Sequence, residues 1–239
     1  FNKRRQEDQE LCIGSTFKMR KAASLGAITL GAVGGAVALA VWLRRRRGCS
    51  RKTCEIVRKA YAATAKGDQH CCVGTSKANT KMNYSAEDQE LGSQTGADLG
   101  LGCGNPVALA QLKEGECVVD LGSGPGLDCL LAAKAVGAKG AAIGIDMTPE
   151  MLEKARAAAD ASGISNAEFR LGSIEAVPVP DAVADAVISN CVVNLSPDKG
   201  QVCREAFRIL RPGGRVAIAD VIKTQELPSG LLTEQALAC

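Results

Sequence analysis

Aromatic residues and histidine are scarce in this sequence. Phenylalanine, tryptophan and tyrosine make up 3% of the 239 residues, which leaves few side chains on which nucleic-acid bases could stack. His70 is the single histidine and no Cys-x-x-Cys pair occurs, so the usual ligand sets of a zinc centre are missing. The net charge of +3 is too small to indicate a nucleic-acid surface. We therefore expect neither a nucleic-acid partner nor a zinc site.

Cysteine, by contrast, is abundant, with 11 copies. The cysteines are scattered over a long chain, unlike the dense spacing of a small disulfide-rich scaffold. Most are expected to pack as small buried hydrophobic residues. Cys117, Cys129 and Cys203 fall on predicted strand or helix positions and are assigned to the core.

Residues 1–51 form an N-terminal extension in this interpretation. Residues 22–43 carry no charge and are followed by four arginines. About 20 apolar residues can cross a bilayer, so this segment predicts a membrane anchor with its arginines on the cytoplasmic side. Two alternatives for this segment are a targeting segment and a translated region that is foreign to the native enzyme. Because the chain starts at Phe1 and stops at Cys239 soon after a predicted strand, we expect both ends to be incomplete.

Strand and helix patterns alternate after residue 116, which predicts an α/β fold with a doubly wound, mostly parallel sheet. A helix is expected at 52–66 and irregular structure at 67–104, within an N-terminal region 52–110 that precedes a core at 111–239. Strands are expected at 117–121, 141–146, 168–171, 186–189 and 215–221, helices at 127–136, 149–162 and 197–210, and a turn at 212–214.

A glycine-rich turn follows the first core strand. Gly122, Gly124 and Gly126 lie between that strand and a helix, where glycine permits positive φ and a close approach of a ligand to the backbone. Asp146 ends the next strand, and its carboxylate can accept hydrogen bonds from both hydroxyls of a ribose. The pattern predicts a nucleotide-like cofactor.

Two residues favour S-adenosylmethionine over a dinucleotide. Leu127 occupies the position where a dinucleotide site normally has its third glycine. Asp120 precedes the glycines, where a carboxylate suits an ammonium or sulfonium group better than a pyrophosphate. A nicotinamide oxidoreductase is kept as an alternative.

Further residues of these segments are assigned to the same cofactor site. Ile174 is expected to pack on the adenine, and Glu175 or the nearby backbone to accept from its amine. Asn190, with Asn194, is expected to shape the pocket around Cys191. Ser123 and Met147 complete the predicted cofactor set.

Three segments resemble the arsenite methyltransferase family, and the similarity runs from about Cys54 to Cys239. The segments around Cys103 and Cys191 are specific to that family, whereas the glycine turn and residues 210–214 are shared by many S-adenosylmethionine-dependent enzymes. The three segments are 97–106 (ADLGLGCGNP), 144–151 (GIDMTPEM) and 189–199 (SNCVVNLSPDK).

The resemblance implies transfer of a methyl group from S-adenosylmethionine to trivalent arsenic, with arsenite and methylarsenicals as substrates. Cys103 and Cys191 match the family's arsenic-holding pair, and Cys239 matches a further arsenic-binding cysteine. Cys71 and Cys72 match its amino-terminal cysteine region, and which of the two is equivalent stays open. The chain departs from the family before residue 52 and lacks everything after Cys239, including the last strands of the methyltransferase sheet.

Soft thiolates are suitable ligands for trivalent arsenic, and its lone pair can attack the sulfonium methyl without a strong base. The rate would then come mainly from positioning. Methylation raises arsenic formally to the pentavalent state, so two electrons are needed, and Cys71 or Cys72 is the candidate relay. Glutathione or thioredoxin would reset the enzyme.

We expect a monomer with a cytoplasmic catalytic core, acting in arsenic detoxification and held at a membrane if residues 22–43 form an anchor. Two alternatives stay open: a methyltransferase for another small nucleophile, and a thiol-based arsenic binder without turnover.

Overall fold

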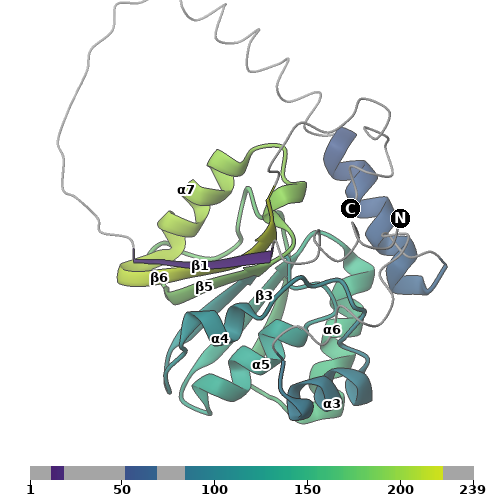
Figure 1. The fold of residues 1–239 in the computed structure, drawn as a ribbon, viewed down its shortest axis with the longest axis horizontal. Helices are drawn as coiled ribbons and strands as arrows, with labels where there is room; N and C mark the ends of the chain where they lie inside the picture. The colour runs from purple at the N-terminus through teal and green to yellow at the C-terminus, as the bar shows by residue number, and fades with distance from the viewer. Residues whose placement is uncertain (1–11, 19–51, 69–83, 223–239) are drawn as a thin grey trace, which may run out of the picture.

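The computed structural model describes residues 12–18, 52–68 and 84–222. A six-stranded sheet in the order β1-β6-β5-β2-β3-β4 forms its centre (Figure 1). Neighbouring strands from β6 to β4 pair in parallel, which confirms the predicted doubly wound α/β fold. These strands are β2 (Cys117–Leu121), β3 (Ala141–Asp146), β4 (Ala167–Leu171), β5 (Ala184–Asn190) and β6 (Leu210–Val221).

Helices lie on both faces of the sheet because its strands are apolar on both sides. Val118 of β2 joins a core cluster with residues of α5 and α6, whereas the next residue, Val119, joins a cluster with residues of α7. Successive side chains of a strand point to opposite faces, so one strand serves both clusters. The helices are α3 (Ala86–Thr95), α4 (Pro106–Ala110), α5 (Leu127–Val136), α6 (Pro149–Ser162) and α7 (Lys199–Ile209), with a further helix over 52–66.

Local sequence signals explain most helix boundaries. α6 begins with Pro149 at its first position, as expected, and ends at Gly163, whose φ is 67°. α7 begins two residues later than predicted, because the Asp198 side chain accepts a hydrogen bond from the Gln201 amide and caps the helix.

The prediction of irregular structure over 67–104 was wrong for α3. Ser85 and Asp88 form a capping box in which each side chain accepts from the other residue's backbone amide, at 3.1 and 3.2 Å. α3 is polar on most of its surface, so no apolar period revealed it. The Ser-x-x-Asp spacing was the available signal.

The predicted turn at 212–214 lies inside β6. Ala184 pairs with Leu210 while Ala186 pairs with Arg215, so the residues between Leu210 and Arg215 bulge out of the ladder. Gly213 adopts φ 85° there, a conformation that glycine allows.

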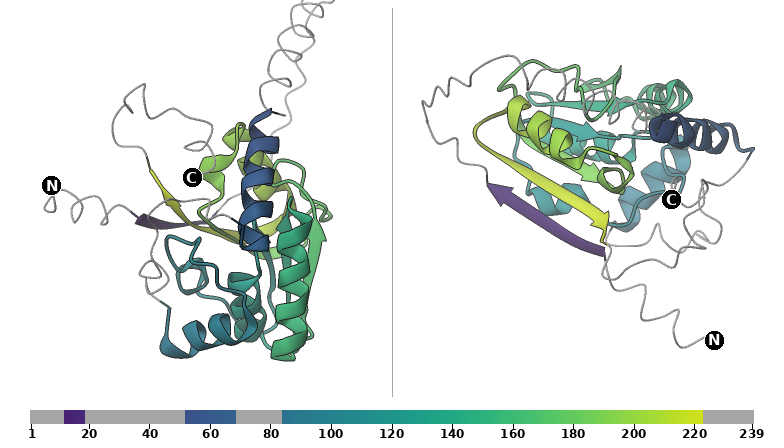
Figure 2. Two further views of the ribbon diagram at one scale, coloured as in Figure 1. Left: turned by 90° about the vertical axis from the view of Figure 1, so that its right-hand side faces the viewer. Right: turned by 90° about the horizontal axis from the view of Figure 1, so that it is seen from above.

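Residues 12–18, which lie within the predicted N-terminal extension, form an edge strand that was not predicted. β1 (Cys12–Lys18) pairs antiparallel with β6, from Cys12 opposite Val221 to Lys18 opposite Arg215. Figure 2 shows β1 in purple alongside β6 in yellow.

The predicted membrane segment 22–43 lies outside the described residues. Within those residues, no helix combines the length and the apolar character that crossing a bilayer requires.

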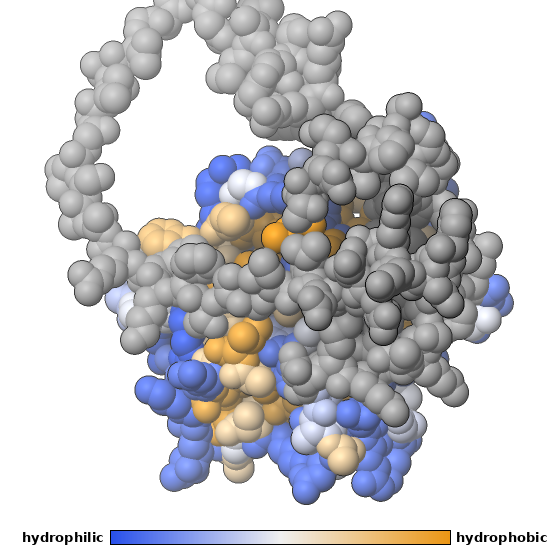
Figure 3. Space-filling view, in the orientation of Figure 1, coloured by the Kyte–Doolittle hydropathy of each residue, from blue (hydrophilic) through white to orange (hydrophobic). Residues whose placement is uncertain are grey.

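The face seen in Figure 3 is mainly hydrophilic at its margins, and apolar residues gather near α4. Three residues are partly buried against the core cluster that contains Val118: Val107 and Leu109 of α4, and Leu112, which lies two residues after this helix. α4 therefore packs against the core of the sheet through a small apolar contact.

Arg215 of β6 joins the end of α4 to the sheet. Its guanidinium binds both carboxylate oxygens of Glu116, at 2.8 and 2.6 Å, and donates to the backbone carbonyls of Ala110 and Gln111. The hydrogen bonds from Arg215 lower the pKa of Glu116. Since both side chains are largely buried, this contact is better placed to stabilise the fold than an exposed ion pair.

We predict that Arg215→Met lowers the free energy of unfolding by about 1–3 kcal/mol at pH 7, because a carboxylate and two carbonyls lose their donor. A carboxyl group with a lowered folded-state pKa stabilises the fold above its unfolded-state pKa, and this contribution disappears as the pH falls. The difference between wild type and variant should therefore narrow below about pH 4, as measured by urea unfolding.

Lys139→Met is the control, because Lys139 lies 4.0 Å from Glu114 with both side chains exposed. It should change the unfolding free energy by less than about 0.5 kcal/mol. The role given to Arg215 would be contradicted if both variants lost the same free energy of unfolding. It would also be contradicted if the difference in unfolding free energy between wild type and Arg215→Met did not depend on pH.

Candidate active site

The candidate site lies where β2, β3 and β5 end at one edge of the sheet. β2 continues directly into the glycine turn, in which Gly122, Gly124 and Gly126 adopt φ values of 73°, 51° and 101°. A Cβ at Gly122 would lie 2.5 Å from the Val192 side chain, whereas one at Gly124 would meet nothing within 4 Å. Gly122 therefore permits close packing of the chain after β5, and Gly124 leaves the backbone open to a ligand.

Two hollows flank this turn and share Gly122. The first is lined by Ser123, Gly124 and Asn190 from the predicted set, together with Tyr84 and Asp128. The second is lined by Asp146, Met147, Ile174 and Glu175, also from the predicted set, and by Cys54 and Val57 of the helix over 52–66. Eight of the ten predicted cofactor residues therefore line the two hollows, whereas Tyr84, Asp128 and Cys54 are among the lining residues that the sequence analysis did not assign.

Two predicted cofactor residues do not line either hollow. Gly126 lies behind the turn as the N-cap of α5. Asp120 is buried beneath it with 2% of its surface exposed, and its Oδ2 has no hydrogen-bond partner. Burial raises the pKa of Asp120, and the neighbouring Asp128 and Asp146 raise it further. A buried carboxyl oxygen without a donor is costly, so a cationic ligand group nearby would be favourable.

Asp146 links the end of β3 to the glycine turn. Its Oδ2 accepts from the Gly124 amide at 2.9 Å and its Oδ1 from the Thr148 amide at 2.8 Å. Burial raises the pKa of Asp146, while these amide hydrogen bonds lower it. Each oxygen retains capacity for a second donor, as the predicted contact with ribose hydroxyls requires.

Glu175 is held in the second hollow by its neighbours. Its carboxylate accepts from the hydroxyl groups of Ser173 and Ser196, and its backbone carbonyl accepts from the Gln201 side chain at 3.1 Å. Both oxygens of the Glu175 carboxylate thus already accept hydrogen bonds from the protein. The predicted contact with the adenine amine would therefore use the remaining lone pairs of this carboxylate or a nearby backbone carbonyl.

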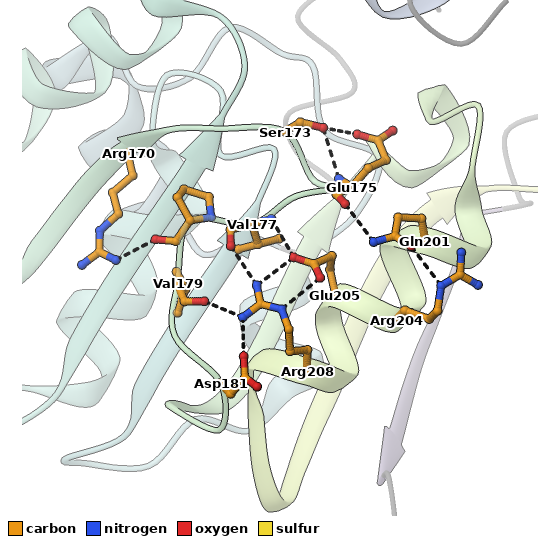
Figure 4. Close-up of polar contacts among 11 residues, drawn as sticks. Arg170, Ser173, Glu175, Val177, Val179, Asp181, Gln201, Arg204, Glu205 and Arg208 are labelled. Carbon is orange, nitrogen blue, oxygen red and sulfur yellow. Dashed lines mark hydrogen bonds and ion pairs between the residues drawn. The ribbon is translucent and has the colours of Figure 1, made fainter. Parts of the chain in front are cut away.

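Arg208 of α7 fixes the segment that carries Glu175 (Figure 4). Its guanidinium donates to the carbonyls of Val177 and Val179 at 2.8 and 2.7 Å and forms ion pairs with Asp181 and Glu205. Glu205 in turn accepts from the Val177 amide at 2.8 Å. The segment that contributes Glu175 to the second hollow is therefore held against α7 by hydrogen bonds and ion pairs.

The two cysteines of the predicted arsenic pair meet beside the first hollow. Cys103 and Cys191 form a disulfide with a Cα–Cα distance of 5.9 Å across a sequence separation of 88. The residues next to them, Gly102 and Asn190, line that hollow. Cys191 adopts φ 52°, and its amide donates to the Ala219 carbonyl at 2.8 Å, which turns the chain sharply after β5.

The other cysteines differ in their surroundings. Cys71, Cys72 and Cys239 lie outside the described residues. Cys129 is buried, as predicted, and Cys117 is partly buried. The assignment of Cys203 to the core was wrong, because α7 turns this residue to solvent. Its helix position alone could not show which face it occupies.

Tyr84 and Asp128 complete the first hollow. The Tyr84 hydroxyl donates to Asp128 Oδ1 at 2.6 Å, and Asn190 Nδ2 donates to Asp128 Oδ2 at 2.9 Å. Burial raises the pKa of Asp128 to about 6, although these two hydrogen bonds lower it. Asp128 lies only two residues after Gly126, and that proximity was the signal that could have identified it.

Comparison with known proteins identifies the core. A family described as a methyltransferase domain matches residues 112–238, which is more than half of the chain. This chain belongs to the methyltransferase domain family. The match starts just before β2 and covers the glycine turn, Asp146 and Cys191.

Individual relatives confirm the resemblance to arsenite methyltransferases. The methyltransferase chain is 48% identical over 193 residues to the arsenite methyltransferase of Halobacterium salinarum, which covers 74% of this chain and 49% of that protein. It is 39% identical over 145 residues to the human arsenite methyltransferase, and this match covers 57% of this chain and 38% of the human protein. The chain thus spans about half, or less, of the length of these relatives.

A solved structure supports the same grouping. The crystal structure of an arsenic(III) S-adenosylmethionine methyltransferase from Chlamydomonas reinhardtii aligns with a TM-score of 0.53 and 39% identity. The alignment covers 70% of this chain and 57% of that structure. The fold and the sequence therefore point to the same group of enzymes.

We predict that mild oxidation with oxidised glutathione links Cys103 to Cys191 in preference to other described cysteines, because their Cα separation suits a disulfide. Peptide mapping by mass spectrometry should find that linked pair before reduction and two separate peptides after it. Cys203, which is free and exposed, should react with an alkylating reagent in both states. A dominant link between either cysteine and Cys54 or Cys117 would contradict this geometry.

Proposed function

We propose that this chain transfers a methyl group from S-adenosylmethionine to trivalent arsenic held by Cys103 and Cys191. The observation that carries the proposal is the meeting of these two sulfurs, from segments 88 residues apart, beside the glycine turn. Arsenite and methylarsenicals are the proposed substrates, and the named activities of the relatives support this choice.

The residues of the two hollows fit S-adenosylmethionine. Beneath the turn, the unpartnered Oδ2 of Asp120 is offered no donor by the protein, and a ligand that carries ammonium and sulfonium charges would favour the ionised form of this carboxyl group. Asp146 can accept from ribose hydroxyls, while Ile174 offers an apolar surface for the adenine. When bound, this molecule supplies a methyl group on a positively charged sulfur, which is an electrophile.

Cys103 and Cys191 must be reduced to hold arsenic. Two thiolates displace hydroxides from arsenite and leave a lone pair on arsenic, since soft sulfur ligands suit this soft metalloid. The lone pair forms the new bond to the methyl carbon as the carbon–sulfur bond breaks, so S-adenosylhomocysteine leaves. No base is needed at arsenic, and the chain contributes chiefly by positioning.

Methylation raises arsenic formally from the trivalent to the pentavalent state, and two electrons restore it. We propose that a pair of cysteine thiols supplies them by closing a disulfide, releasing two protons, with Cys71 or Cys72 as relay and Cys239 as a further arsenic ligand. Glutathione or thioredoxin would then reduce the disulfide. Because this cycle requires reduced thiols, we assign the core to the cytoplasm, with arsenic detoxification as its role.

Asp146→Ala should raise the dissociation constant for S-adenosylhomocysteine about 10- to 100-fold, because it removes a charged acceptor and releases the Gly124 amide. Isothermal titration calorimetry measures this. Asp160→Ala, which changes an exposed carboxylate on α6, is the control and should bind like wild type. Wild-type affinity for Asp146→Ala would remove this residue from the cofactor site.

The reaction itself is tested by incubating the reduced chain with arsenite and methyl-labelled S-adenosylmethionine. Arsenic speciation should show methylated arsenic for wild type and for Cys203→Ser, which alters an exposed cysteine of α7. Cys103→Ser and Cys191→Ser should reduce the product to background while S-adenosylhomocysteine still binds. Equal turnover by the serine variants would overturn the proposal.

A further inference from the structure

Two connections fasten the Cys103 segment to the end of β5. One is the bond between the Cys103 and Cys191 sulfurs. The other is the side chain of Asn190, whose Oδ1 accepts from the Cys103 amide at 2.9 Å and whose Nδ2 donates to the Gly104 carbonyl at 2.8 Å. A Cβ at Gly102 would lie 2.7 Å from the same Nδ2, so the backbone passes directly against this amide.

The Asn190 side chain is itself held by a second pair of residues. Its Nδ2 donates to Asp128 Oδ2 at 2.9 Å and lies 3.1 Å from the Tyr84 hydroxyl. That hydroxyl donates to the other Asp128 oxygen at 2.6 Å. Burial and the charge of Asp128 raise the pKa of Tyr84, so the phenol keeps its proton and continues to donate.

This arrangement connects the two proposed substrate positions. Tyr84, Asp128 and Asn190 line the first hollow beside the glycine turn, and Asn190 also precedes Cys191 in the chain. The segment that Asn190 holds contributes Leu99, Leu101 and Gly102 to the same hollow. Movement of that segment would therefore alter both the cofactor pocket and the separation of the two sulfurs.

The sulfur–sulfur bond cannot hold this segment during catalysis, because arsenic binding requires reduced cysteines. We propose that Tyr84, Asp128 and Asn190 form a positioning network that keeps the Cys103 segment docked when the Cys103–Cys191 bond is open. The inference rests on the proposed function and extends it. It assigns to Tyr84 and Asp128 a role in holding both the thiol pair and the pocket.

The test compares S-adenosylhomocysteine binding in two redox states of the full chain. In the reduced state, Asn190→Ala should raise the dissociation constant at least about tenfold, and Tyr84→Phe about threefold to tenfold. After oxidation by oxidised glutathione, which accepts two electrons and two protons from the thiols, the sulfur bond replaces the network. Both variants should then bind within about threefold of oxidised wild type.

A second measurement follows the thiols without the cofactor. The reduced pair should bind phenylarsine oxide about tenfold more weakly in Asn190→Ala, because an undocked Cys103 lowers the effective concentration of the second thiol. Asn166→Ala is the matched control, since Asn166 Nδ2 also donates to three carbonyls, those of Ala133, Gly137 and Gly140, away from the site. It should lower stability without a redox-dependent change in binding.

The outcomes separate the inference from the proposed function. A binding loss that is equal in both redox states means that these side chains contact the ligand directly and overturns the network. Unchanged binding by the reduced variants overturns it as well. Failure of wild type to bind S-adenosylhomocysteine in either state would remove the proposed function and the inference together.

Discussion

The parallel register of the sheet brings the glycine turn, Asp146 and Asn190 to the same end of the sheet. β2 pairs with β3 on one side and with β5 on the other, so Asp120 lies opposite both Gly144 and Ile188. The glycine turn follows the last residue of β2, and Asp146 and Asn190 are the last residues of β3 and β5, so all three emerge at the same end of the sheet. A register shift of one residue would exchange the side chains that the two core clusters receive from a strand, so the packing that stabilises the fold also aligns the site.

The same constraint explains how much could be predicted from the sequence. Buried strands such as β2 and β3 consist mainly of small and apolar residues and are followed by a glycine or end at an acidic residue, and their predicted bounds agree with the structure. α3 and β1 escaped prediction because their local patterns are weak and tertiary contacts decide their structure. Tyr84 could not be assigned for a related reason: its role depends on Asp128, which lies 44 residues away in the chain.

The acidic residues of the site show how the fold tolerates an unfavourable arrangement. Asp120 and Asp128 are buried and Asp146 is partly buried, and each has a raised pKa. Asp128 and Asp146 receive hydrogen bonds from within the protein, whereas one oxygen of Asp120 has no donor. A buried carboxyl oxygen without a donor lowers stability, and a positively charged ligand at the open glycine turn would favour the ionised form of Asp120.

The disulfide between Cys103 and Cys191 requires two distant segments of the chain to be held close together, and the sequence did not show which contacts hold them. Closing it requires the Cys103 segment and the end of β5 to stay within the short span of a disulfide, with a Cα–Cα distance of 5.9 Å. The fold meets this demand with hydrogen bonds that do not involve sulfur, from the Asn190 side chain to the Cys103 amide and the Gly104 carbonyl. Because these bonds do not depend on the redox state of the thiols, the cysteines are free to exchange one partner for another while the backbone around them stays in place.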